Sequence, residues 1–327
     1  MSWTNRSVLI TGATGFIGSH LTERLVNEGA SVRALIHYNS TGTLGWLENS
    51  PVIKEIDLIA GDICDRDRLR DAMQGVDVVF HLAALIAIPY SYNAPASYVR
   101  TNIEGTLNVL QSARDLGIRR LVHTSTSEVY GTARYTPMNE DHPLQGQSPY
   151  SASKIGADKL AESFHLSFGV PLVTVRPFNT FGPRQTARAV IPTIINQCLG
   201  ADSIKLGNVH PTRDFNYVSN TVDGFLLAAL SGEAVGKTIN LGSNRETSIK
   251  KLAELIIQQI GRPITVEVDE QRVRPKGSEV ERLYADNTLA RTLLKWEPRV
   301  SLDEGLKYTI DWWRERPDNR QADVYAI

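Results

Sequence analysis

The chain has 327 residues, 42% of them hydrophobic and 22% charged, with a formal net charge of -1 at pH 7. This is an ordinary globular balance, and it provides no global field that would attract nucleic acid or an anionic membrane. Two isolated cysteines, Cys64 and Cys198, argue against a disulfide framework and favour a reducing cytoplasm, and no apolar run approaches the roughly 20 residues that span a bilayer.

The first half of the chain alternates short apolar runs with helical patterns. The strands are predicted at residues 7–11, 32–36, 56–60, 76–82, 120–125 and 172–175. The helices between them are predicted at residues 16–27, 67–73, 98–116 and 149–168. Continuous apolar strands that alternate with helices indicate a parallel sheet covered on both faces. We therefore expect an α/β fold with a Rossmann-like, doubly wound parallel sheet.

The regular alternation ends after Arg176-Pro177, where prolines separate shorter elements. Helical patterns recur at residues 221–230, 249–260 and 302–313. We expect a dinucleotide-binding domain over residues 1–178 and a smaller, interleaved C-terminal substrate-binding domain over residues 179–327. Residues 214–240 or so are expected to return to the first domain. The polar tail from Pro317 is expected to be peripheral.

A glycine-rich segment connects the first predicted strand to the first helix. Its spacing, Gly-x-x-Gly-x-x-Gly, is formed by Gly12, Gly15 and Gly18. Glycines allow a tight turn and a close approach to a pyrophosphate, and the helix N-terminus adds N–H groups and a positive dipole. A tight structural turn would give the same pattern, but here a strand precedes it and further βα units follow. We predict a dinucleotide site that includes these glycines with Phe16 and Ile17.

A tyrosine and a lysine lie four residues apart in the helix predicted at residues 149–168. Of the eleven tyrosines, only Tyr150 has a lysine at this spacing, Lys154. Residues four apart share one face of a helix, and an ammonium beside a phenol favours the phenolate. Such a phenol can take a proton from an alcohol. An ordinary surface pair would give the same weak motif.

These motifs together resemble the extended short-chain dehydrogenase/reductase family, from residue 8 to about residue 313. The resemblance also uses Asp62 after the third strand and the segment His81-Leu82-Ala83-Ala84 after the fourth. It implies that Asp62, with Ile63, holds the adenine of the cofactor, and that Leu82, Ala83 and Ala84 line the nicotinamide side. A helix N-cap is an equally good interpretation of Asp62. For His81 we favour a position at the edge of the core.

The end of the second predicted strand bears on the choice of cofactor. NAD binders usually carry an acid there, whereas this chain reads Leu35-Ile36-His37-Tyr38-Asn39-Ser40. Without a carboxylate there is no repulsion against a 2′-phosphate. His37 and Arg33 could supply positive charge, although Arg33 fits a solvated strand position equally well. We expect tightly bound NADP or NAD, with NADP favoured.

The resemblance assigns catalytic roles to four side chains. Tyr150 would take the proton from the 4-hydroxyl of a sugar, while Lys154 lowers the pKa of Tyr150 and holds the cofactor ribose. Thr126 would hydrogen-bond the 4-oxygen, although its hydroxyl could instead cap a turn. Glu128 would remove the C5 proton once C4 is a ketone, so that water leaves from C6. The general acid stays open between protonated Glu128 and a water relayed by Ser127.

The segment Thr126-Ser127-Glu128-Val129-Tyr130-Gly131 resembles the nucleotide-sugar 4,6-dehydratases, in the Thr-Ser-Glu branch that includes GDP-mannose dehydratases. The same triplet occurs in UDP-glucuronate decarboxylases, which are the second candidate. A nucleotide-sugar 4-epimerase and a non-catalytic, dinucleotide-binding regulatory protein are further alternatives. Residues 84–102 and 176–192 are more similar to bacterial NDP-N-acetylglucosamine 4,6-dehydratases of legionaminic acid pathways. We therefore expect GDP- or UDP-N-acetylglucosamine as substrate, converted to the 4-keto-6-deoxy sugar.

The diphosphate of such a substrate needs local positive charge, and the planar fork of arginine matches phosphate geometry. By resemblance, Asn179 contacts the diphosphate, and Arg213 and Arg274 clamp the phosphates. Arg188 and Arg184 are weaker candidates. Arginines on solvated faces would give the same pattern.

The remaining partners follow from the resemblance and from composition. The helices near residues 98–116 and 150–168 match two that commonly form a four-helix bundle in the family, so we expect a homodimer. The seven histidines have no metal-ligand spacing and no Cys-x-x-Cys is present, so no metal is expected. Neither nucleic acid nor a membrane is expected as a partner.

Overall fold

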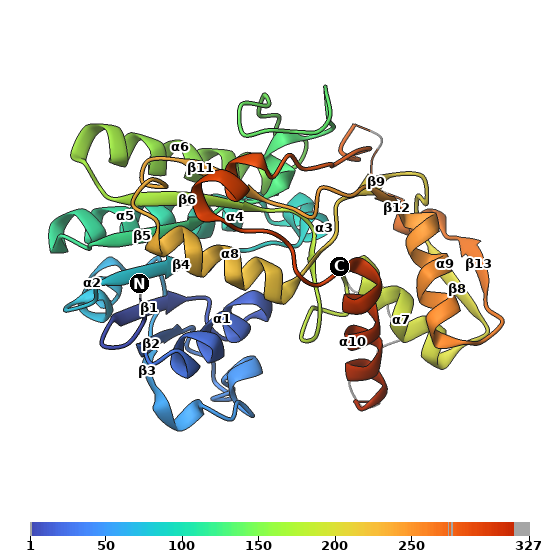
Figure 1. The fold of residues 1–327 in the computed structure, drawn as a ribbon, viewed down its shortest axis with the longest axis horizontal. Helices are drawn as coiled ribbons and strands as arrows, with labels where there is room; N and C mark the ends of the chain where they lie inside the picture. The colour runs from blue at the N-terminus through green and yellow to red at the C-terminus, as the bar shows by residue number, and fades with distance from the viewer. Residues whose placement is uncertain (1, 274, 276, 317–327) are drawn as a thin grey trace.

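The computed structural model describes residues 2–273, 275 and 277–316. Arg274, one of the expected phosphate ligands, and the tail from Pro317 lie outside the described residues. The described chain forms a larger lobe around a sheet and a smaller lobe beside it, made mainly from the second half of the chain (Figure 1). None of the helices in these residues is both long enough and apolar enough to cross a membrane.

The larger lobe is built on a seven-stranded sheet in which every neighbouring pair of strands is parallel. The strand order is β11-β6-β5-β4-β1-β2-β3, so the doubly wound α/β fold is confirmed. The strands are β1 (Ser7–Thr11), β2 (Ser31–Ile36), β3 (Ile56–Ala60), β4 (Val78–His81), β5 (Arg120–Thr124), β6 (Leu172–Pro177) and β11 (Thr238–Leu241). The strand order reverses between β1 and β4, where Thr11 lies beside His81. Ligands of open α/β sheets bind outside the carboxyl ends of the strands at such a point.

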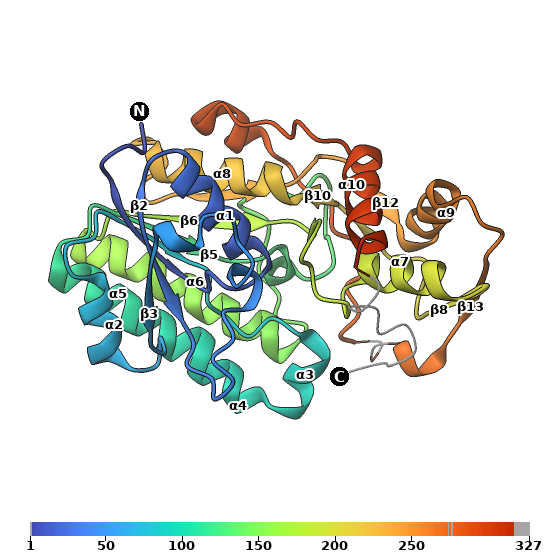
Figure 2. The ribbon, with the colours of Figure 1, turned by 90° about the horizontal axis from the view of Figure 1, so that it is seen from below.

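Helices cover both faces of this sheet, as Figure 2 shows. One face packs on α1 (Phe16–Asn27) and α8 (Val218–Leu230). The other face packs on α2 (Arg66–Met73), α5 (Gly105–Leu116) and α6 (Pro149–Phe168). Apolar side chains alternate between the two faces along each strand, so Ile10 and Val78 lie in one core while Leu9 and Val79 lie in the other.

The smaller lobe has a core of its own and three short strand pairs. Its helices are α7 (Val190–Gly200), α9 (Ile249–Ile260) and α10 (Leu302–Arg314). Its strand pairs are β7 (Thr180–Phe181) with β10 (Asn216–Tyr217), β9 (Thr212–Arg213) with β12 (Thr247–Ser248), and β8 (Ser203–Leu206) with β13 (Thr265–Val268). Between β10 and β12 the chain passes back into the larger lobe, where α8 packs on the sheet and β11 pairs with β6.

Short elements complete the described chain. They are the helices α3 (Ile88–Asn93) and α4 (Pro95–Tyr98), the 3-10 turns η1 (Gly45–Leu47), η2 (Ile53–Glu55), η4 (Ser127–Tyr130) and η5 (Glu270–Arg272), and the π-helical segments η3 (Val99–Glu104) and η6 (Ala290–Leu294). The single helix predicted at residues 98–116 is therefore α5 preceded by η3. A π-helical turn shifts the register of side chains and is frequent at functional sites.

Local sequence explains why α6 starts where the site needs it. Ser148 and Ser151 form a reciprocal capping box, and Pro149 occupies the first helical position. Gly169 ends the helix with a φ of 67°, in the left-handed region that glycine adopts without strain. These signals place Tyr150 in the first turn, where the helix dipole favours negative charge.

Candidate active site

The glycine-rich turn after β1 packs so tightly that it fits a dinucleotide phosphate site. Gly12 has a φ of +74°, and a Cβ atom built on it would lie 2.8 Å from the backbone nitrogen of Ala83. A Cβ atom on Gly18 would lie 2.1 Å from the carbonyl oxygen of Gly12. Gly15 is the N-cap of α1 and offers no side-chain cap, which leaves the first N–H groups of the helix for a ligand. Phe16 and Ile17 open α1 and pack against the core of the sheet.

The structure places Asp62 and His37 side by side, at the ends of β3 and β2. One oxygen of Asp62 accepts a hydrogen bond from the backbone nitrogen of Cys64 at 2.8 Å, and the other lies 3.6 Å from His37 Nδ1. The N-cap of α2 is Asp65, so the helix-cap interpretation of Asp62 is wrong. Ile63 is buried beside this turn and its carbonyl accepts a hydrogen bond from Asn108.

Arg33 does not contribute positive charge near His37. Its guanidinium donates to the carboxylate of Asp57 at 3.1 Å and to the carbonyls of Ala72 and Gln74 at 3.0 and 2.8 Å. These partners hold the side chain against the C-terminal end of α2. Of the two cations expected near a 2′-phosphate, only the exposed His37 lies close to Asp62.

His81 is buried in a hydrogen-bonded chain, as its interpretation as a core-edge residue predicted. Its Nδ1 lies 2.8 Å from the hydroxyl of Thr11, and its Nε2 lies 3.0 Å from the hydroxyl of Thr106. Burial, with the nearby His123 and Lys154, holds the pKa of His81 well below its usual value. The hydroxyl of Thr11 also accepts a hydrogen bond from the backbone nitrogen of Ala83 at 3.2 Å, which fixes the Leu82–Ala84 segment beside the glycine turn.

Asn102, in the π-helical segment η3, clamps Leu85, the residue directly after the Leu82–Ala84 segment. Its amide oxygen accepts from the backbone nitrogen of Leu85 at 2.9 Å, and its amide nitrogen donates to the Leu85 carbonyl at 3.0 Å. The same nitrogen lies 2.9 Å from the hydroxyl of Ser153 in α6. A single buried side chain therefore ties the loop after β4 to the helix that carries Tyr150 and Lys154.

The turn η4 brings the expected catalytic residues of the Thr126–Glu128 segment to Tyr150. Thr126 is the N-cap of this turn and accepts a hydrogen bond from the backbone nitrogen of Glu128 at 3.2 Å. The side chain of Thr126 acts to lower the pKa of the Tyr150 phenol, whereas the charge of Glu128 acts to raise it. Thr126 thus caps a turn and also affects the pKa of Tyr150. Ser127 is buried.

The pair of Tyr150 and Lys154 differs from expectation in one respect. Burial raises the pKa of Tyr150, and the groups that act most strongly on it after burial are Thr126, Glu128 and Tyr98 rather than Lys154. Burial also lowers the pKa of Lys154, to about 8. The Lys154 ammonium instead donates to the carbonyl of Thr124 at 2.6 Å, at the end of β5. The expected lowering of the Tyr150 pKa by Lys154 is therefore not seen among these contacts.

A buried ionic cluster that was not predicted from the sequence lies next to this pair. Asp158, one helical turn beyond Lys154, accepts hydrogen bonds from Ser125 at 2.7 Å, His123 at 3.1 Å and Arg176 at 3.0 Å. The available signal was an acid at the same four-residue spacing as Tyr150 and Lys154, on a face of α6 that is otherwise buried.

The expected phosphate ligands are distributed over the smaller lobe. Asn179 has a buried side-chain oxygen without a hydrogen-bond partner among the described residues. Arg213 is buried and donates to the carbonyl of Thr212 at 2.9 Å and to Glu279 at 3.4 Å. Arg188 is exposed. Arg184 donates to Glu23 of α1 at 2.9 Å, so it joins the two lobes.

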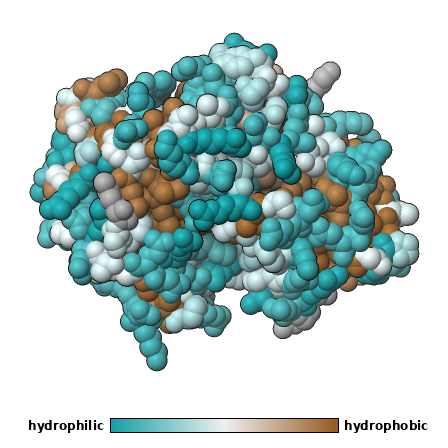
Figure 3. Space-filling view, viewed as in Figure 1, coloured by the Kyte–Doolittle hydropathy of each residue, from teal (hydrophilic) through white to brown (hydrophobic). Residues whose placement is uncertain are grey.

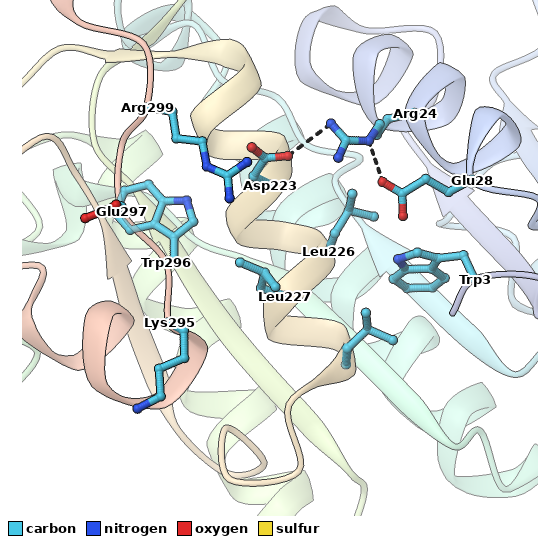
Figure 4. A pocket seen from close by; sticks show the side chains of 11 residues that line it. Trp3, Arg24, Glu28, Asp223, Leu226, Leu227, Lys295, Trp296, Glu297 and Arg299 are labelled. Carbon is cyan, nitrogen blue, oxygen red and sulfur yellow. Dashed lines mark hydrogen bonds and ion pairs between the residues drawn. The ribbon is translucent and has the colours of Figure 1, made fainter. Parts of the chain in front are cut away.

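A hollow lies away from these residues, on the face of the sheet that α1 and α8 cover (Figure 4). Its volume is about 280 Å³, slightly less than the roughly 300 Å³ at which typical ligand pockets begin. Figure 4 shows Arg24 reaching both Glu28 and Asp223, with Trp3 and Trp296 on opposite sides of the leucines of α8. Because Arg24 is paired with two acids and α6 lies on the other face of the sheet, we assign this hollow no part in the site.

Comparisons with known proteins agree with this geometry. The profile of the family described as GDP-mannose 4,6 dehydratase matches residues 9–309. The chain is 34% identical to the UDP-N-acetyl-alpha-D-glucosaminuronate decarboxylase of Bacillus cytotoxicus, over 94% of this chain and 97% of that protein. It is 32% identical to the UDP-glucose 4-epimerase of Mycolicibacterium smegmatis, over 94% of this chain and 98% of that protein.

A solved structure gives the same result in three dimensions. DesIV, the dTDP-glucose 4,6-dehydratase of Streptomyces venezuelae, was solved as a double mutant with NAD and DAU bound. It matches with a TM-score of 0.86 at 28% identity and covers 95% of this chain and 98% of that chain. Relatives of full-length similarity thus perform three reactions, namely dehydration, decarboxylation and epimerisation.

Proposed function

Because the chain belongs to the GDP-mannose 4,6 dehydratase family of extended short-chain dehydrogenases/reductases, we propose that it is a nucleotide-sugar 4,6-dehydratase. The observation that carries the proposal is the turn η4, which holds Glu128 close enough to Tyr150 for its charge to act on the phenol. An oxidation at C4 needs only the tyrosine and its partners. A carboxylate beside them adds a base for the neighbouring carbon, which dehydration requires.

The residues divide the proton transfers between them. Tyr150 takes the proton of the sugar 4-hydroxyl, and Thr126 hydrogen-bonds the 4-oxygen. Glu128 then removes the C5 proton, which lies alpha to the new ketone, and the 6-hydroxyl leaves as water with a proton from Glu128 or from a water at Ser127. The protons released from O4 and C5 balance the one that leaves in water and the one that returns to C5. A nicotinamide held by the glycine turn and the Leu82–Ala84 segment would supply the acceptor for the C4 hydride and its return to C6.

The electrostatic effect of Glu128 on Tyr150 also suggests an order of events. The charge of Glu128 raises the pKa of Tyr150 because two neighbouring anions repel one another. A phenolate at Tyr150 and a carboxylate at Glu128 therefore oppose each other until the sugar proton has reached Tyr150. Once Tyr150 is neutral, Glu128 is the remaining base.

We propose NAD rather than NADP as the cofactor. The tight glycine turn and the uncapped N-terminus of α1 fit the pyrophosphate of either one. The preference for NADP rested on the lack of an acid at the end of the second strand and on the charges of His37 and Arg33. Arg33 is bonded elsewhere, however, and a carboxylate from the end of the third strand, Asp62, lies beside His37. That carboxylate would repel a 2′-phosphate. Mass spectrometry of the nucleotide released by acid denaturation tests this choice, and released NADP would refute it.

For the substrate we propose a nucleoside diphosphate hexose, with GDP- and UDP-N-acetylglucosamine as the first candidates. Asn179 offers an unpartnered side-chain oxygen on the segment that enters the smaller lobe, and its amide can turn to present the nitrogen instead. Arg213 lies buried in the same lobe. One solved neighbour, the UDP-N-acetylglucosamine 4-epimerase of Methanobrevibacter ruminantium, holds UDP-N-acetylmuramic acid, which supports an N-acetylated hexose.

Decarboxylation of a nucleotide-linked glucuronate is the second candidate. It is favoured by the relative from Bacillus cytotoxicus, whose 34% identity extends over 97% of its length. Oxidation at C4 of such a substrate gives a β-keto acid that loses carbon dioxide without a base at C5. The two candidates therefore differ in whether Glu128 is needed.

The test is mass spectrometry of the purified protein incubated separately with UDP-GlcNAc, GDP-GlcNAc, GDP-mannose and UDP-glucuronate. We expect the loss of one water from a hexose substrate. Loss of carbon dioxide from the glucuronate would replace the proposal by the decarboxylase, and an isomer of unchanged mass would replace it by an epimerase. No change with any substrate would favour a regulatory dinucleotide-binding protein.

Variants then assign the steps. Tyr150→Phe should keep the cofactor bound and abolish turnover, whereas Tyr308→Phe, an exposed tyrosine of α10, should not affect it. Glu128→Gln should still reduce the cofactor slowly but should not release water. Glu254→Gln on the exposed face of α9 is the matched control. Dehydration at the normal rate by Glu128→Gln would mean that another base is at work.

We further propose that the protein acts as a homodimer in a reducing cytoplasm. The dimer is supported by apolar side chains that no other described element covers, such as Leu166 of α6, which is 76% exposed, and Val99 of η3. On the face shown in Figure 3, hydrophobic areas are separated by hydrophilic side chains. Sedimentation velocity should give twice the chain mass for the wild type, and Leu166→Glu should shift it toward the monomer. Both cysteines are free, which suits a reducing compartment.

A further inference from the structure

The cluster around Asp158 is a buried polar arrangement that the proposed steps do not use. Asp158 is 5% exposed and lies in α6, one turn beyond Lys154. One of its oxygens accepts from His123 Nε2 at 3.1 Å. The other accepts from Ser125 at 2.7 Å and from Arg176 Nη2 and Nε at 3.0 and 3.3 Å. Four donors from two neighbouring strands therefore meet on one carboxylate.

These bonds fix the end of β5 against α6. Ser125 directly precedes Thr126, and His123 lies two residues before Ser125 in the strand. Between them, the Thr124 carbonyl accepts the bond from Lys154. The same short segment is thus held to α6 at three consecutive residues. The position of Thr126 relative to the Tyr150 phenol depends on this attachment.

The cluster also determines which of its buried side chains carry a charge. Arg176 packs over the ring of Tyr130 at 4.8 Å and donates to its hydroxyl at 2.9 Å, so its charge is buried from both sides. Burial would raise the pKa of Asp158, but the donors around it hold that pKa at about 2. Burial lowers the pKa of His123, which leaves this ring uncharged at neutral pH.

Lys154 is the group that responds to this charge. The titratable groups that act on it are His81 of β4, His123 of β5 and Asp158 of α6. Next to these, Arg176 of β6 acts on Asp158, and Glu128 of η4 and Tyr98 of α4 act on Tyr150. Burial brings the pKa of Lys154 down to about 8, and Asp158 acts in the opposite direction. Without Asp158, two buried cations would have no anion between them.

Resting on the function proposed above, we propose that Asp158 is the positioning residue of the Tyr150–Lys154 pair. It anchors the strand end that carries Thr126, and its negative charge offsets Arg176 so that Lys154 remains an ammonium next to the site. The side-chain hydrogen-bond partners of Asp158 are His123, Ser125 and Arg176, none of which takes part in the proposed proton transfers. Asp158 acts through Lys154 and through Ser125.

The decisive readout is the titration of Lys154 itself, which requires no turnover. Proteins labelled with 13C at the lysine Cε are titrated by NMR, and the Lys154 signal is assigned by its absence from Lys154→Arg. Asp158→Asn preserves size and some hydrogen bonding but removes the charge, and should lower the pKa of Lys154 by about one unit. Ser125→Ala removes a hydrogen bond to the same carboxylate without a change of charge, and should leave that pKa unaltered.

Asp158→Glu separates charge from fit. It keeps the carboxylate but cannot reproduce all four short bonds, so the Lys154 pKa should stay near its wild-type value while Tm falls. If Asp158→Asn does not fold, the Lys154 pKa measured in the wild type still tests the proposal. A wild-type Lys154 that titrates below about pH 6, two units under its value of about 8, is neutral at pH 7 and overturns the proposal, as does an unchanged pKa in Asp158→Asn.

The pH dependence of turnover provides a second test of the proposal. If the Lys154 pKa falls from about 8 to about 7, the charged fraction drops about fivefold at pH 8 but only about twofold at pH 7. The kcat of Asp158→Asn should follow this pH dependence, with KM changed less than about twofold because Asp158 does not touch the substrate. A uniform loss at all pH values would mean a merely structural role. If no substrate is turned over by the wild type, the proposed function fails while the NMR result stands by itself.

Discussion

The glycine turn gives the sharpest structural prediction, for Gly12→Ala. Gly12 has a φ of +74°, which costs an alanine about 1–2 kcal/mol. The new Cβ would lie 2.8 Å from the backbone nitrogen of Ala83, and relieving such overpacking costs about 1–3 kcal/mol more. We therefore expect a loss of about 2–5 kcal/mol in the free energy of unfolding.

Gly75→Ala is the matched control, because it has the same backbone strain without the contact. Gly75 has a φ of +70°, and nothing lies within 4 Å of the position of its Cβ. Urea unfolding should show a loss of only about 1–2 kcal/mol, with the cofactor content unchanged. Gly12→Ala should also retain less nucleotide after purification, measured by absorbance of the acid extract. Equal stability losses and equal nucleotide content in the two variants would refute the packing argument.

Three further predictions concern Asn102, Lys154 and Arg33. Asn102→Ala leaves both backbone groups of Leu85 without their partner, and should cost about 2 kcal/mol in urea unfolding; a loss under about 0.5 kcal/mol would mean that water replaces the amide. The folded pKa of Lys154, about 8, lies below the unfolded value of about 10.4, so its contribution to stability should rise with pH from about 8 to 10.4 and be constant below. Lys154→Met should remove this rise, and identical pH dependence of the urea midpoint in both proteins would contradict the assignment. Arg33→Gln should not change which nucleotide is released, and a switch between NADP and NAD would place Arg33 in the cofactor site after all.

Much of the larger lobe follows from local signals in the sequence. The strand β1 and the helices α1 and α6 begin and end at the predicted residues, because glycines and the Ser148-Pro149 cap mark their limits. The seventh strand, β11, was missed. Its four residues include the polar Asn240, which argues against a buried strand. The side chain of Asn240 accepts a hydrogen bond from Tyr130, a partner too distant in sequence to be predicted.

The candidate site was predicted in part, and the errors share a cause. The spacing of Tyr150 and Lys154 identifies a helix face, but it does not show that burial dominates both pKa values. In the same way, the positive charge of Arg33 in the second strand suggested a partner for a 2′-phosphate. Its actual partners, Asp57 and the carbonyls after α2, lie far away in sequence and come together only in the folded sheet. Long-range neighbours of this kind leave no local pattern.

The late position of β11 in the chain has a consequence for synthesis on the ribosome. The strand β6 ends at Pro177, but its partner β11 begins at Thr238, and Trp296 completes the core on that face of the sheet. At typical elongation rates of about 5–20 residues per second, the interval from the end of β6 to the end of β11 is on the order of several seconds. During this time the edge of β6, whose residues are mostly apolar, has no pairing strand, and an unpaired apolar edge is a template for aggregation. The nascent chain is therefore expected to need protection by chaperones until both lobes have been made.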